Sequence, residues 1–95
     1  MENQHKLIQG YRDLSQDEID LMNDIKSAGE LLQSIIDKVQ KHVEDQFEQA
    51  DSENSEIEIE RIRVADPFAW CIAAKSDLQT GLMKLTRSVA QPTTF

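Results

Sequence analysis

Apolar residues recur every three or four positions along two stretches of the chain. The first series covers residues 19–47 and the second covers residues 68–89. This spacing places the apolar side chains on one face of an α-helix, whereas a strand would show alternation. The pattern therefore predicts two long amphipathic helices, over residues 15–48 and 66–91.

Local signals mark where these helices begin and end. Ser15 and Glu18 have the spacing of a capping box, in which each side chain accepts the backbone amide of the other. Asp66-Pro67 opens the second helix, because aspartate is a good N-cap and proline is favoured at the first helical position. Pro92 stops that helix, since proline cannot continue it.

The remaining segments are predicted as an arm and a connection. Residues 1–14 form an N-terminal arm that includes a short helical turn, and residues 49–65 form an acidic connection, mobile over 49–56. Residues 57–60 alternate as in a strand, but four residues without a partner are too few to make one. The expected fold of residues 1–95 is a single all-α domain, an antiparallel helical hairpin with a short N-terminal helix.

A chain of 95 residues with two long helices buries only a thin core. Disulfides cannot supplement it, because Cys71 is the only cysteine. A metal site is not expected either, because His5 and His42 lie far apart with no further ligand at suitable spacing. We therefore expect a homo-oligomer. Four apolar residues that lie off the main stripes or at their edge are predicted to pack against other protomers: Met22, Leu31, Trp70 and Met83.

The net charge of −8 argues against a general binder of DNA or RNA polymers. The acidity is concentrated in residues 44–60, which carry eight acidic and no basic side chains, whereas residues 61–95 have a net charge of +3. A small anion bound outside the acidic segment is therefore not excluded. No apolar stretch approaches the roughly 20 residues that cross a bilayer, and the N-terminus does not read as a signal peptide. A cytoplasmic setting fits best.

Nothing in the sequence resembles an active site. His42 lies among charged residues and is interpreted as solvated, and Cys71 occupies an apolar helical position typical of a small buried hydrophobe. The sequence contains neither GxxxxGK(S/T) nor GxGxxG, the two glycine-rich patterns that form phosphate-binding loops. We therefore predict no catalytic residues, no cofactor and no enzyme activity.

Two groups near the start of the chain could bind an anionic ligand. Tyr11 is the only tyrosine, lies outside the apolar stripes and stands between Gly10 and Arg12. An aromatic face beside a planar cation suits a nucleobase and its phosphate. From spacing alone, the simpler interpretation is that Tyr11 covers the hydrophobic contact at the start of the first helix. Lys26, with Asn23 on the same side, lies at the edge of the apolar stripe, where a lysine either reaches solvent or meets an anion.

The C-terminal helix contains a mid-helix glycine, Gly81, which costs about 1 kcal/mol relative to alanine. Close approach of another helix is the usual compensation. Several copies of the basic residues Lys75, Lys84 and Arg87 around a symmetry axis could form a basic pocket.

Three segments of the sequence resemble the phage anti-CBASS protein 2 family: residues 10–15, residues 21–26, and residues 77–83 continuing to 89–92. The resemblance covers residues 5–30 and 70–95, and leaves out the acidic middle. It implies a homohexamer of helical hairpins that acts in the cytoplasm of the infected bacterial host.

The resemblance also implies a ligand. Members of the family bind cyclic dinucleotides such as 3′,3′-cGAMP, hold them without cleavage and so block host CBASS immunity. The ligand-holding tyrosine and lysine fall on Tyr11 and Lys26. The family also takes up cyclic trinucleotides at a separate site, for which Lys75, Thr80 and Arg87 are candidates here.

Two other classes of function are considered beside this one. An acidic helical adaptor or phage regulator would bind a protein through its apolar face and need no nucleotide. A nucleotide hydrolase would destroy the messenger, and it would require a metal site or a general base.

Overall fold

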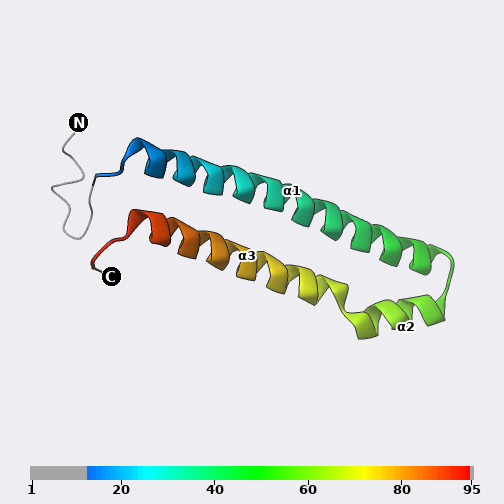
Figure 1. The fold of residues 1–95 in the computed structure, drawn as a ribbon. Coiled ribbons are helices and arrows are strands. Elements are labelled where there is room, and N and C mark those ends of the chain that lie inside the picture. Colours follow the sequence, from blue (N-terminus) through cyan, green and yellow to red (C-terminus); the bar gives the residue numbers. More distant parts are fainter. Residues whose placement is uncertain (1–12, 95) are drawn as a thin grey trace. The chain divides into compact units, whose positions relative to one another are not determined.

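A computed structural model describes residues 13–94 of the chain, and this part contains three α-helices and no strand. They are α1 (Gln16–Ser52), α2 (Glu56–Ala65) and α3 (Pro67–Ala90), shown in Figure 1. The prediction of an all-α helical hairpin is confirmed. The predicted short N-terminal helix lies outside the described residues.

The chain divides into two compact units. The first, here called the turn unit, comprises Leu31–Leu78 and so contains the end of α1, all of α2 and the start of α3. The second, here called the terminal unit, combines the chain up to Glu30 with the chain from Gln79 onward. Within each unit, the α1 segment runs antiparallel to the α3 segment (Figure 1).

Helix α1 begins with the capping box expected from the sequence. The Ser15 amide donates to Glu18 Oε1 at 2.8 Å, and the Glu18 amide donates to Ser15 Oγ at 3.2 Å. Both groups would otherwise be amides without an intrahelical acceptor. The reciprocal pair therefore fixes the start of α1 at Gln16.

The end of α1 corrects the sequence prediction. The helix continues to Ser52, four residues beyond the expected end at 48. It then closes in a Schellman motif, in which Asn54 adopts a left-handed φ of 54°. The Ser55 amide donates to the Ala50 carbonyl at 3.0 Å, and the Asn54 amide donates to the Asp51 carbonyl at 3.1 Å. A three-residue turn thus replaces the first part of the long connection predicted over 49–65.

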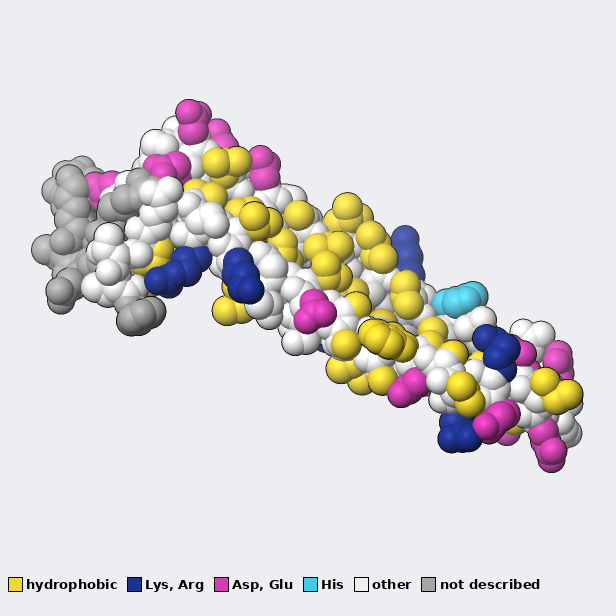
Figure 2. Space-filling model, turned by 60° about the horizontal axis from the view of Figure 1, so that its bottom comes forward, with side chains coloured by type: hydrophobic (Ala, Val, Ile, Leu, Met, Phe, Trp, Pro, Cys, Tyr) yellow, Lys and Arg dark blue, Asp and Glu magenta, His cyan; other side chains and the backbone are white. Residues whose placement is uncertain are grey.

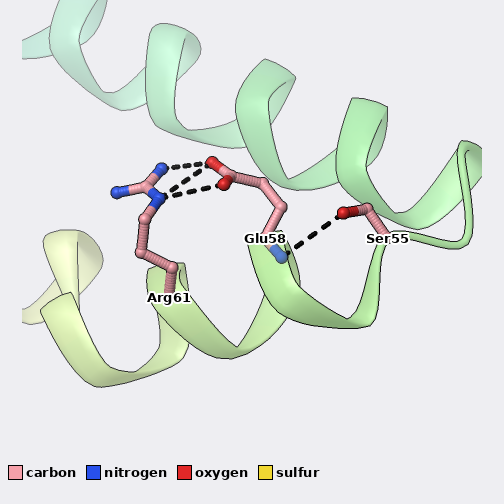
Figure 3. Close-up of polar contacts among 3 residues, drawn as sticks. All are labelled: Ser55, Glu58 and Arg61. Atoms are coloured by element: carbon pink, nitrogen blue, oxygen red, sulfur yellow. Dashed lines mark hydrogen bonds and ion pairs between the residues drawn. The ribbon is translucent and has the colours of Figure 1, made fainter.

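Most of the rest of that predicted connection is helix α2. Ser55 is its N-cap and accepts the Glu58 amide at 3.4 Å (Figure 3). Residues 55–58 repeat the Ser-x-x-Glu pattern of residues 15–18, a signal that the sequence interpretation passed over. The strand-like alternation at 57–60 is helical in the structure, because the buried side chain of α2, Ile62, follows helical spacing from Ile59.

Two ion pairs lie along the exposed side of α2. Arg61 donates from its guanidinium to both carboxylate oxygens of Glu58 (Figure 3), and Arg63 pairs in the same way with Glu60 at 2.6 and 2.9 Å. Each hydrogen bond favours the ionised carboxylate and lowers the pKa of Glu58 and Glu60. The charges of this part of α2 are therefore largely paired with each other.

A left-handed residue separates α2 from α3. Asp66 has a φ of 50°, and its amide donates to the Ile62 carbonyl at 2.8 Å. Its own carbonyl accepts the Trp70 amide at 3.3 Å, so α3 starts immediately after it with Pro67 at the first helical position, as predicted. Helix α3 ends at Ala90, one residue before the predicted end, where Gln91 adopts a φ of 51°.

The core is thin in the described part of the chain. Five hydrophobic side chains are buried there, and all belong to the turn unit: Ile36, Val43, Ala50, Ile62 and Cys71. The expectation that Cys71 serves as a small buried hydrophobe is confirmed. Fourteen large hydrophobic residues are exposed, including Leu31 and Trp70, and Figure 2 shows such side chains open at the surface. This surface is what a chain that associates with a partner would present.

The glycines correct one further expectation. A Cβ built on Gly29 would lie 3.3 Å from Leu82 Cδ1, so α3 approaches α1 closely there in the terminal unit. A Cβ on Gly81 would meet nothing within 4 Å. The close helix approach expected at Gly81 therefore occurs at Gly29 within the protomer.

Candidate functional site

Lys26 and Asn23 lie on helix α1 in the terminal unit. They are three residues apart and therefore share one side of the helix. Both side chains are exposed, beside a half-buried stripe formed by Met22, Ile25 and Gly29. Lys26 forms no ion pair with any residue of 13–94. The Lys26 ammonium group thus lies exposed at the edge of an apolar stripe, without an ionic partner among residues 13–94.

The other three residues of this predicted site lie outside the described part of the chain. They are Gly10, Tyr11 and Arg12. The pairing of Tyr11 with Lys26 consequently stays a prediction.

The second predicted set lies on helix α3. Thr80 and Arg87 are exposed in the terminal unit and, seven residues apart, lie on nearly the same side of the helix. Lys75 is half-buried and belongs to the turn unit. Lys75 therefore belongs to a different unit from Thr80 and Arg87.

Arg87 lines a hollow of about 400 Å³ in the terminal unit, to which neither Thr80 nor Lys75 contributes. The Arg87 Nη2 atom donates to the Thr94 carbonyl at 3.3 Å, and the Thr86 hydroxyl donates to the Leu82 carbonyl at 3.0 Å. The hollow thus combines one cation and one hydroxyl with apolar walls. Sequence reasoning missed Thr86, although its position one turn after Leu82 gave the signal. The full lining is Leu82, Met83, Thr86, Arg87, Ala90 and Pro92.

A larger groove of about 490 Å³ lies in the turn unit. Its walls come from α1, the end of α2 and α3. All of its lining side chains are apolar: Ile35, Ile36, Val39, Val43, Ala65, Pro67, Trp70, Cys71, Ala74 and Leu78. Trp70 stands at the groove with 73% of its surface exposed. This groove has no side chain that would neutralise a phosphate, so it suits an apolar side chain rather than an anion.

Two features bear on catalysis and on membranes. Within residues 13–94, no three histidine, cysteine or acidic side chains gather as a metal ion would require. None of the helices in this part of the chain combines the length and apolarity needed to span a bilayer.

Comparison with known proteins shows the family of the chain. No family model matches the chain. A protein named Anti-CBASS protein 2, from Pseudomonas phage JBD67, is 38% identical to it over 105 aligned residues, which cover 97% of both proteins. The alignment therefore spans nearly the whole of both proteins, whereas the resemblance seen in the sequence covered residues 5–30 and 70–95.

Proposed function

The chain belongs to the anti-CBASS protein 2 family, and on that premise we propose that it captures the cyclic nucleotide messengers of bacterial CBASS immunity. The ligand is a cyclic dinucleotide such as 3′,3′-cGAMP, which the protein holds without cleaving it. Sequestration keeps the messenger from the host effector. The action takes place in the cytoplasm of the infected bacterium.

The observation that carries this proposal is the 38% identity with the phage relative, in an alignment that covers 97% of both proteins. The relative's name assigns an anti-CBASS function and no mechanism. Support for sequestration comes from the residues themselves, because Tyr11 lies outside the apolar stripes and Lys26 lies at the edge of one. The Lys26 ammonium is exposed and has no ion pair with residues 13–94, which leaves it available to a phosphate.

The ligand's chemistry matches a site with two-fold symmetry. A cyclic dinucleotide has two bases and two phosphates, and a pocket between two related protomers would supply Tyr11 and Lys26 twice. Each stacked base contributes about 1–3 kcal/mol, and each charge-assisted hydrogen bond contributes about 1.5–3 kcal/mol. Two of each reach the roughly 12 kcal/mol of nanomolar binding at the upper end of these ranges. Arg12, Asn23 and Gly10 are proposed to complete the pocket.

Self-association is part of the proposal, with a homohexamer as the expected assembly. It is supported by the small number of buried side chains and by the exposed apolar residues Leu31, Trp70 and Met83. A thin core leaves folding dependent on further burial, which other copies provide.

A second ligand class, the cyclic trinucleotides, is proposed to bind apart from the first. The hollow beside Arg87 favours the C-terminal end of α3 as that place, because a cation and a hydroxyl share one concave surface there. Thr80 and Lys75 remain candidates for neighbouring contacts.

The test is isothermal titration with 3′,3′-cGAMP, followed by heat release and chromatography of the ligand. We expect tight binding and recovery of intact ligand. Tyr11→Ala should abolish binding, whereas Tyr11→Phe, which keeps the stacking face, should retain most of it. Recovery of a cleaved product would replace sequestration by hydrolysis. Absence of binding to cyclic di- and trinucleotides would leave the protein-binding adaptor as the better description.

A further inference from the structure

We draw no further inference here: the strongest candidate, the apolar groove of the turn unit between α1, the end of α2 and α3, beside the exposed Trp70, carries nothing, because nothing in the structure shows what covers it.

Discussion

Replacing Lys26 by alanine isolates the electrostatic part of the proposed ligand binding. The side chain is exposed and forms no ion pair with the described residues, so its loss should change the free energy of unfolding by no more than about 0.5 kcal/mol. A charge-assisted hydrogen bond to phosphate contributes about 1.5–3 kcal/mol. Two Lys26 side chains in a two-fold pocket contribute about 3–6 kcal/mol, and Lys26→Ala should therefore raise Kd about 10²- to 10⁴-fold.

The assay is calorimetric titration of Lys26→Ala with 3′,3′-cGAMP at two salt concentrations. Lys38→Ala is the matched control, because Lys38 is also an exposed lysine on α1, but outside the proposed site. The Lys26 variant should show a weaker dependence of affinity on salt, since it lacks the phosphate contact. Equal affinities for the two lysine variants would refute the phosphate role of Lys26. A loss of only about tenfold would leave one lysine for each ligand and contradict the two-fold pocket.

Three further predictions concern the turn unit and are measured at one protein concentration. Ser55→Ala removes the N-cap of α2 and should lower the free energy of unfolding by about 1 kcal/mol; an unchanged urea midpoint would show that the cap contributes nothing. Ile62→Ala should lower the free energy of unfolding by about 2–5 kcal/mol, because Ile62 is only 4% exposed. Ile57→Ala should change it little, because Ile57 is 86% exposed. Equal effects of the two changes would contradict the assignment of Ile62 to the buried face. Because arginines lower the pKa of Glu58 and Glu60 in the fold, both pairs stabilise α2 above the ordinary glutamate pKa and lose this effect as pH falls. The double variant Glu58→Gln/Glu60→Gln should lose less free energy of unfolding than the wild type as the pH falls. An equal loss would show that the two ion pairs do not stabilise α2.

The acidic middle of the chain shows how a correct composition can suggest a wrong structure. Residues 49–56 are polar and charged with one apolar side chain, which is typical of a connection. In the structure, residues 49–65 form helix except at the three-residue turn 53–55. Burial of Ala50 and Ile62 in the turn unit contributes to this outcome, together with a second Ser-x-x-Glu cap and two ion pairs along α2.

The sequence by itself determined the helical class, the start of α1 at its capping box, the start of α3 at Pro67 and the exposed cation at Lys26. Each of these follows from spacing or from hydrogen bonds between residues three or four positions apart, which neighbouring residues decide among themselves. Only the tertiary structure decided which glycine lies under a neighbouring helix. Gly29 and Gly81 look alike along the chain, but Leu82 packs against the first and leaves the second open. Close approach depends on the side chains of another segment, so a local sequence pattern cannot predict it.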